Sequence, residues 1–197
     1  MALKESPVRE QNLLPKCFQL GALHNDHHNP FLEAGACLFG DEIVIYDVDG
    51  TIINIEHRLK YLTQKPKTDW KRFLAEIGND TCYEHIKEMV VEDFISGKTV
   101  CLVTARNEGQ APETIAQMQQ FGVPYHYLFM RKKGDYRCDT IVKEEILRLL
   151  PKEKILYVVE DRPRVIDMWR QNGLKVIAVN TAPDYDYTNA ATAEDCE

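Results

Sequence analysis

Five short runs rich in β-branched residues recur along the chain, and most are separated by stretches with helical spacing. The runs are Ile43–Val48, Val100–Thr104, Tyr127–Met130, Ile155–Val159 and Val176–Val179. Strands that alternate with helices form parallel βαβ units, and such strands are apolar throughout because helices cover both faces of the sheet. The pattern therefore predicts an α/β fold with a doubly wound, five-stranded parallel sheet.

Four stretches have the spacing and the end signals of helices. They lie at about residues 82–97, 111–122, 138–151 and 162–173. The first stops at Gly97 and the last begins with Pro163, which are the end signals expected of a helix. In the third, Asp139 is expected to be the N-cap residue.

Composition limits the class of protein. A chain of 197 residues with 44% hydrophobic content can bury one substantial core, so one enzyme-sized domain is expected. The formal net charge of -7 argues against a broad nucleic-acid-binding surface and leaves room only for a local basic patch. Six cysteines without close pairs suggest neither a zinc site nor a disulfide framework. With no apolar run of about 20 residues and no signal pattern, we expect a soluble, cytoplasmic protein without a membrane partner.

Acidic and polar residues follow three of the predicted strands. They are Asp47 and Asp49, then Thr104 and Arg106, then Glu160 and Asp161. Any one of these acids could simply cap a helix or fill a turn. In doubly wound sheets, however, ligands bind beyond the carboxyl ends of the strands, and carboxylates gathered there repel one another unless a cation intervenes. Hard oxygen ligands suit Mg²⁺, so a magnesium site is predicted at this edge.

These residue types suit phosphoryl transfer. An aspartate is ionised at neutral pH and can attack phosphorus without a base to activate it. The charge repulsion from a phosphate must then be offset by a metal ion and a lysine, while a second acid, held protonated, donates to the departing oxygen. Asp47 as nucleophile and Asp49 as acid, then base, would give an aspartyl-phosphate that water hydrolyses.

The segments "DVDGT", "LVTAR", "DTIVKEE" and "VVEDR" resemble, in order, the four motifs of the haloacid-dehalogenase (HAD) phosphohydrolase superfamily. The resemblance implies a Rossmann-like HAD fold, with Asp47 as nucleophile and Asp49 as general acid/base. It also implies that Thr104 and Lys143 hold the phosphate.

The same resemblance implies a metal site. Mg²⁺ would bind the Asp47 carboxylate, the Asp49 main-chain carbonyl and Asp161. Glu160 stands where many members of the superfamily have an aspartate. We expect Glu160 to support the metal site without binding the ion.

A narrower likeness runs roughly from Asp41 to Asn180. "DVDGTIINIEHR", "RKKGDYRCDTIVKEEI" and "EDRPRVIDMWRQNGL" are similar to the 3'-phosphatase domain of phage-type polynucleotide kinase-phosphatase. The similarity implies that the phosphate pocket also uses Arg58, Arg106, Arg131 and Asp139. Alternatively, Arg58 could be a surface helix residue, Arg131 part of a solvated turn and Asp139 only a helix cap. The chain departs from the family pattern at Ala105 and Cys138.

The chain is expected to consist of an N-terminal extension of unknown role (1–40), a HAD-like phosphatase domain (41–183) and an acidic tail (184–197). A small helical cap insert at about 53–80 would leave the site open enough for a polynucleotide end. Its apolar residues at helical spacing are Trp70, Phe73, Leu74 and Ile77. We expect this face to lie on the domain; the less favoured alternative is that Trp70 stacks on the substrate.

Two further segments imitate functional motifs. "SGKT" at Ser96–Thr99 resembles the end of a phosphate-binding P-loop, but Glu92 stands where the first glycine belongs, so no ATP site is predicted. "LHNDHHNPF" contains His24, His27 and His28, which could bind a metal but are more often solvated in such a loop.

The favoured function is a Mg²⁺-dependent phosphatase that removes 3'-phosphates from DNA or RNA ends. Its partner would be a phosphorylated nucleic-acid end or a nucleotide. The alternatives are a nucleotidase that cleaves nucleoside monophosphates, which suits the acidic balance, and a non-catalytic binding module on the same fold.

Overall fold

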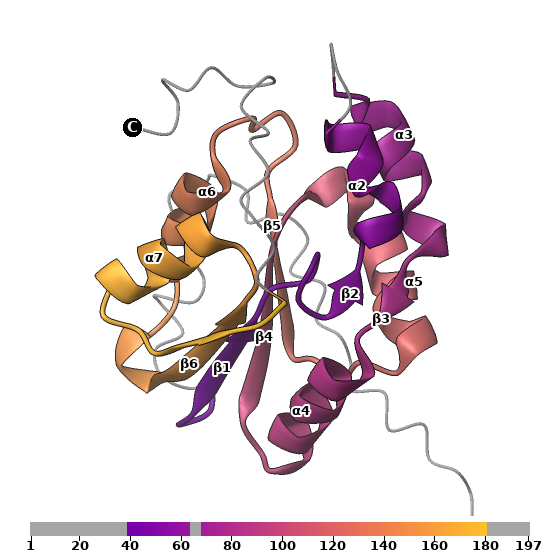
Figure 1. The fold of residues 1–197 in the computed structure, drawn as a ribbon. Coiled ribbons are helices and arrows are strands. Elements are labelled where there is room, and N and C mark those ends of the chain that lie inside the picture. Colours follow the sequence, from indigo (N-terminus) through magenta and orange to yellow (C-terminus); the bar gives the residue numbers. More distant parts are fainter. Residues whose placement is uncertain (1–38, 64–67, 181–197) are drawn as a thin grey trace, which may run out of the picture.

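A computed structural model of the chain describes residues 39–63 and 68–180, and a five-stranded parallel sheet forms its centre (Figure 1). The strand order is β5-β4-β1-β6-β7. The strands are β1 (Ile43–Tyr46), β4 (Thr99–Asn107), β5 (Tyr127–Arg131), β6 (Ile155–Glu160) and β7 (Val176–Ala178). Every pairing is parallel, which confirms the predicted α/β sheet. The main differences are that β1 ends two residues before Val48 and that β4 continues to Asn107.

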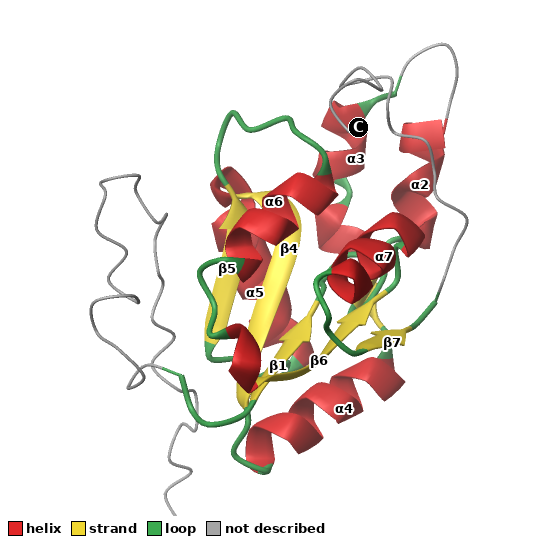
Figure 2. Cartoon of the chain, turned by 90° about the vertical axis from the view of Figure 1, so that its left-hand side faces the viewer, coloured by secondary structure: helices red, strands yellow, loops and turns green. Residues whose placement is uncertain are grey.

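Helices cover both faces of the sheet because the central strands are apolar on both sides. Ile43 and Ile45 belong to a core with α6 (Asp139–Leu147) and α7 (Pro163–Gln171). Val44 and Tyr46 point the other way, into a core with α4 (Glu84–Ile95) and α5 (Ala111–Phe121). Figure 1 shows the two helix layers on either side of the sheet, and Figure 2 looks onto the sheet from the side of α6 and α7.

A buried carboxylate, that of Asp93, links α4 to two central strands of the sheet close to the predicted site. Asp93 accepts hydrogen bonds from the hydroxyls of Tyr46 on β1 and Tyr157 on β6, and it pairs with Lys98 at 2.7 Å. Burial and the charge of Asp93 raise the pKa of Tyr157 to about 12, so both tyrosines remain hydrogen-bond donors at neutral pH. Because Tyr46 directly precedes Asp47, this network fixes the end of β1.

The helix ends follow the sequence signals, with one exception. Gly122 ends α5 with φ 67°, in the left-handed region, and Pro163 begins α7. Ser96 is the C-cap of α4 and Thr99 begins β4, so "SGKT" joins a helix to a strand. The prediction that Asp139 is the N-cap of α6 is wrong: Cys138 holds that position, and the Asp139 carboxylate pairs with arginines instead.

The insert lies between two short antiparallel strands, β2 (Ile53–Asn54) and β3 (Thr81–Cys82). It contains α2 (Glu56–Thr63), α3 (Trp70–Ala75) and the 3₁₀ turn η2 (Ile77–Asn79). Phe73 and Ile77 are buried, whereas Trp70 and Leu74 are more than a third exposed. Only half of the predicted apolar face is therefore covered by the domain.

Two more 3₁₀ turns, η3 (Glu108–Gln110) and η4 (Lys152–Lys154), precede α5 and β6. The histidine cluster at His24–His28, the N-terminal extension up to residue 38 and the acidic tail lie outside the described residues. Within the described part of the chain, no helix is both long enough and apolar enough to cross a membrane.

Candidate active site

The turn after β1 presents Asp47 and Asp49 at the carboxyl edge of the sheet. The Asp47 amide donates to the Val159 carbonyl at 3.0 Å, so this residue stays in line beside β6 although β1 has ended. The amides of Ile52 and Ile53 both donate to the Val48 carbonyl, at 3.0 and 2.8 Å, and close the turn. The backbone therefore holds both acids in place on a tight loop.

Lys143 reaches from α6 to the end of this turn. Its Nζ donates to Asp47 Oδ1 at 2.5 Å and to Glu160 Oε2 at 2.7 Å. All three side chains are buried. Lys143 thus lies where it can neutralise charge next to Asp47.

Asp47, Glu160 and Asp161 form an acidic cluster whose ligand atoms lie within 4.8 Å of one another. Burial raises the pKa of Asp47 to about 7 although the Lys143 ammonium opposes the rise, and Glu160 adds to it. Burial and the charges of Asp47 and Glu160 raise the pKa of Asp161 to about 9. Three carboxylates facing one ammonium favour the uptake of protons or of a cation. An all-oxygen donor set of this kind fits a hard divalent ion.

Gly50 allows Asp161 to approach the turn. A Cβ atom at Gly50 would lie 2.1 Å from Asp161 Oδ2, closer than any side chain permits, and Gly50 has φ 87°. The next residue, Thr51, donates from its hydroxyl to Asp161 Oδ1 at 3.1 Å. The sequence "DGT" therefore shapes the acidic cluster through the glycine and the threonine as well as through its aspartate.

Glu160 is engaged by donors on both carboxylate oxygens. Lys143 Nζ and Trp169 Nε1, at 3.3 Å, donate to Oε2, while the Arg162 amide donates to Oε1 at 3.4 Å. These contacts hold Glu160 against Lys143. Its expected role, supporting the metal site without binding the ion, remains a prediction.

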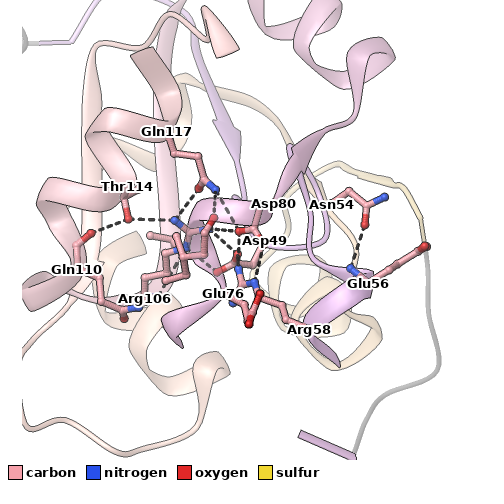
Figure 3. A network of polar contacts seen from close by, with 12 residues as sticks. Asp49, Asn54, Glu56, Arg58, Glu76, Asp80, Arg106, Gln110, Thr114 and Gln117 are labelled. Carbon is pink, nitrogen blue, oxygen red and sulfur yellow. Dashed lines mark hydrogen bonds and ion pairs between the residues drawn. The ribbon is translucent and has the colours of Figure 1, made fainter. Parts of the chain in front are cut away.

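Asp49 lies between two arginines (Figure 3). Arg106 donates from Nε to Oδ2 and from Nη2 to Oδ1, both at 2.7 Å, and Arg58 Nη2 donates to Oδ1 at 2.6 Å. Burial opposes ionisation of Asp49, but the Arg106 and Arg58 guanidiniums outweigh it and hold the pKa of this carboxyl well below its usual range. The structure therefore differs from the expectation that Asp49 is held protonated, because both arginines face it.

Asp80 supports both arginines and was not predicted from the sequence. Arg58 donates to it from Nε at 2.7 Å and from Nη2 at 2.9 Å, and Arg106 Nη2 lies 3.5 Å from its Oδ2. The Phe73 ring lies 4.2 Å from the Arg58 guanidinium carbon. Arg58 is fully buried, so the alternative of a surface helix residue is wrong.

Gln117 joins this network from α5, on the main domain. Its Nε2 donates to Asp80 Oδ2 at 3.0 Å and to the Ile77 carbonyl at 3.0 Å. Arg106 Nη1 in turn donates to Gln117 Oε1 at 2.9 Å and to the Thr114 hydroxyl at 3.1 Å. The insert and the main domain therefore share one buried polar network, visible in Figure 3.

Arg131 and Asp139 form a second ionic group, on the α6–α7 side. Arg131 donates to Asp139 Oδ1 at 2.8 Å and to the Ala105 carbonyl at 2.9 Å, and Arg162 also pairs with Asp139. The alternative that Arg131 is a solvated turn residue is therefore wrong. No described hydrogen bond joins this group to Asp47, although Asp139 lies one helical turn from Lys143 on α6.

Thr104 is buried in β4, which pairs directly with β1. Its hydroxyl accepts a hydrogen bond from the Arg106 amide at 3.2 Å. Among the described contacts none joins Thr104 to Asp47 or Lys143. Its assignment to the phosphate pocket remains a prediction.

The comparisons with known proteins agree with this architecture. The family model described as the polynucleotide kinase PNKP phosphatase domain matches residues 41–185. A chain in the solved Pnkp1/Rnl/Hen1 complex is 25% identical, with a TM-score of 0.59, and the match covers 71% of this chain and 46% of that chain. This chain therefore corresponds to less than half of the length of that protein.

Two solved phosphatases of lower identity share the fold. A class C acid phosphatase from Bacillus anthracis is 17% identical with a TM-score of 0.54, and the match covers 81% of this chain and 73% of that one. A predicted phosphoglycolate phosphatase from Haemophilus somnus is 14% identical with a TM-score of 0.51, covering 80% and 93%.

The family match extends over most of the chain and includes every residue of the acidic cluster and of both arginine groups. It confirms the resemblance proposed from the sequence motifs. A phosphatase of this kind acts on a phosphorylated substrate. The chain therefore belongs to the family of PNKP phosphatase domains, and it is a HAD-type phosphatase domain.

Proposed function

We propose that the protein is a Mg²⁺-dependent 3'-phosphatase that removes the terminal phosphate from DNA or RNA ends through an aspartyl-phosphate on Asp47. The observation that carries the proposal is the contact of Lys143 Nζ with Asp47 Oδ1, at 2.5 Å, inside a cluster that also contains Asp161. This contact places a buried cation beside the carboxylate that would attack phosphorus.

The Asp47 and Asp161 carboxylates, with the Asp49 main-chain carbonyl, would hold the magnesium ion. The raised pKa values of both carboxyls and the all-oxygen donor set fit such an ion. When bound, Mg²⁺ would lower the repulsion between the phosphate and the acids and would polarise a phosphoryl oxygen. Lys143 supplies the second positive charge for the transferred group.

In the first step an Asp47 oxygen attacks phosphorus, and the bond between phosphorus and the 3'-oxygen of the substrate breaks. The electron pair goes to the 3'-oxygen, which takes a proton from Asp49. Because the free protein holds Asp49 ionised, Asp49 must gain this proton when the substrate binds. A phosphate anion nearby favours that change, since it opposes a negative charge on Asp49.

In the second step a water molecule attacks the phosphorus of the aspartyl-phosphate. Asp49, now ionised between Arg58 and Arg106, takes a proton from the water, and the bond from phosphorus to the Asp47 oxygen breaks. Inorganic phosphate leaves and the Asp47 carboxylate is restored. Asp49 is ionised in the free protein, as a base must be before it takes a proton.

Phosphate release from four substrates in the presence of Mg²⁺ tests the proposal. They are a 3'-phosphorylated oligonucleotide, the same oligonucleotide phosphorylated at its 5' end, a 3'-mononucleotide and a 5'-mononucleotide. We expect the highest kcat/KM for the 3'-phosphorylated oligonucleotide and no release after Asp47→Asn. A higher kcat/KM for the 5'-mononucleotide would favour a nucleotidase and overturn the proposal.

A further inference from the structure

One loop beside the site carries an aromatic side chain that the fold leaves uncovered. This loop, residues 132–137 between β5 and α6, is called the basic loop below. Its Tyr136 is 82% exposed, more than any other large hydrophobic side chain in the described part of the chain. Lys132, Lys133 and Arg137 are also exposed. The chain as a whole has a net charge of -7, so the cations of the basic loop form a local patch of positive charge on an acidic protein.

The basic loop is held in one conformation by its own polar contacts. Arg131 donates to the Arg137 carbonyl and so spans the loop. Arg137 in turn donates to Asp135 from its amide and its Nε, at 3.0 Å each, and it forms two hydrogen bonds with Glu145 on α6, at 2.7 and 2.8 Å. Gly134, with φ 84°, allows the turn. Tyr136, between Asp135 and Arg137, is therefore presented on a fixed backbone.

The basic loop lies at the same edge of the sheet as the candidate active site. It begins at the carboxyl end of β5 and leads into α6, where Asp139 and then Lys143 follow. In Figure 1 the loop rises beyond the end of β5, at the same end of the sheet as α2 and α3. A chain that enters the site from this direction would pass the basic loop before its end reaches Lys143.

An exposed aromatic ring next to cations is the combination that binds single-stranded nucleic acid. Every base has a π-face, so stacking on an aromatic side chain tolerates any sequence, while nearby lysines attract the backbone phosphates. A ring on a fixed loop loses little conformational freedom when a base stacks on it.

We propose that the basic loop binds the strand upstream of the 3'-terminal phosphate, with a base stacked on Tyr136 and Lys133 close to a phosphodiester. The inference rests on the proposed 3'-phosphatase function and deepens it. It assigns to this loop the recognition of a polynucleotide, whereas the buried site recognises only the phosphate. A mononucleotide has no upstream base or phosphodiester for the basic loop to bind.

Steady-state kinetics of two Tyr136 variants test the assignment. For Tyr136→Ala we expect KM for a single-stranded 3'-phosphorylated oligonucleotide to rise roughly 5- to 100-fold, the range that the loss of one stacked base gives. The kinetics with a 3'-mononucleotide and with p-nitrophenyl phosphate should stay unchanged. Tyr136→Phe should retain the wild-type KM because its ring still stacks.

Two further variants complete the design. Ile95→Ala removes a side chain that is 76% exposed at the end of α4, and it should change neither substrate class. For Lys133→Ala we expect the oligonucleotide KM to rise less steeply with salt concentration. The slope of log KM against log salt concentration should fall by about the amount that one phosphate contact contributes. An unchanged oligonucleotide KM in Tyr136→Ala would overturn the assignment, as would an equal change for all substrates.

If the protein is not a 3'-phosphatase, the experiments give a different result from those above. In that case the wild-type protein would release no phosphate from the 3'-phosphorylated oligonucleotide. Fluorescence anisotropy with a labelled oligonucleotide then decides the role of the basic loop: binding that Tyr136→Ala weakens supports a strand-binding loop, and binding that it leaves unchanged overturns it.

Discussion

Two aspartates that are two positions apart in the sequence have opposite environments. Burial raises the pKa of Asp47 to about 7 although the Lys143 ammonium opposes the rise, whereas two arginines hold the pKa of Asp49 well below its usual range. Environments that separate the pKa values of neighbouring acids allow them to take different roles in catalysis. In the proposed reaction, Asp47 accepts the phosphoryl group and Asp49 moves protons.

The contact between Gly50 and Asp161 gives a prediction at the residue scale. Gly50→Ala would place a Cβ atom 2.1 Å from Asp161 Oδ2, so this carboxylate must move out of the acidic cluster. We expect Mg²⁺-dependent kcat/KM to fall by about 100-fold or more, since misplacement of about 1 Å in a reacting group can cost that much. Phosphatase assays at increasing Mg²⁺ concentrations would measure the loss.

Gly97 provides the matched control. It has φ 88°, nearly the same as Gly50, but a Cβ atom there would meet nothing within 4 Å. Gly97→Ala therefore carries the same backbone strain without the clash. It should lower thermal stability slightly and leave kcat/KM unchanged. Equal losses of activity in both variants would mean that strain in the backbone, and not the position of Asp161, limits the reaction.

Residues inside the four motifs could be predicted from the sequence, whereas their supports could not. Asp47, Lys143 and Asp161 lie in segments with fixed order, and the structure brings them together. Asp80 lies in a short polar turn, and its contacts with Arg58 and Gln117 span 22 and 37 positions. The one available signal was physical: an arginine buried beside a site requires a carboxylate partner.

At the scale of elements, the insert is joined to the main domain by charge as well as by apolar packing. Asp80, at the end of η2, binds Arg58 of α2 and Gln117 of α5. Asp80→Ala would leave Arg58 buried without one of its two carboxylates. We expect the free energy of unfolding to fall by about 3–5 kcal/mol, the range measured when one partner of a buried ion pair is removed. Chemical denaturation of the two proteins would measure the difference.

Asp69 gives a control in the same insert. Its carboxylate caps α3 by accepting from the Arg72 amide at 3.0 Å, at an exposed position. Asp69→Ala should cost only about 1 kcal/mol, as is typical of an N-cap. If Asp80→Ala cost no more than Asp69→Ala, the buried network would not be what holds the insert in place.

The main strands and helices were predictable because their apolar periodicity is strong. The short strands β2 and β3 have two residues each, too few for any periodicity, and they pair across the whole insert. The N-cap of α6 was misplaced by one residue because Asp139 pairs with Arg131 of β5 and with Arg162, the residue before α7, and so does not cap its helix. Ion pairs between distant residues therefore determine the position of the Asp139 side chain, and local sequence signals do not reveal such pairs.

At the scale of the whole molecule, the sheet gathers more negative than positive charge at the acidic cluster. The pKa values of about 7 for Asp47 and about 9 for Asp161 exceed the ordinary value of about 3.9 for an unfolded chain. Between pH 5 and 8 the folded protein therefore binds more protons than the unfolded chain, so its stability falls as pH rises. Acids with lowered pKa, such as Asp49 and Asp93, titrate below this range.

This difference in bound protons predicts that stability depends on pH, and that a metal ion bound to the acidic cluster removes this dependence. Without metal, in the presence of a chelator, we expect the free energy of unfolding to fall by on the order of 6 kcal/mol from pH 5 to pH 8, since over much of this range both carboxyls keep their protons in the folded protein and lose them on unfolding. With saturating Mg²⁺ the fall should be much smaller or reversed, because the ion binds the ionised carboxylates. Urea denaturation at several pH values measures both. The same pH profile with and without Mg²⁺ would show that the acidic cluster does not bind the ion.

The central claim is that the Asp47 carboxylate carries the phosphoryl group during turnover. The direct measurement is acid quenching during turnover of a 3'-phosphorylated oligonucleotide, followed by borohydride reduction and peptide mass spectrometry, since borohydride converts an acyl phosphate of aspartate into homoserine. The account predicts homoserine at position 47 in the wild-type protein and none in Asp47→Asn. Normal turnover with unmodified Asp47, or with the modification at another residue, would contradict it.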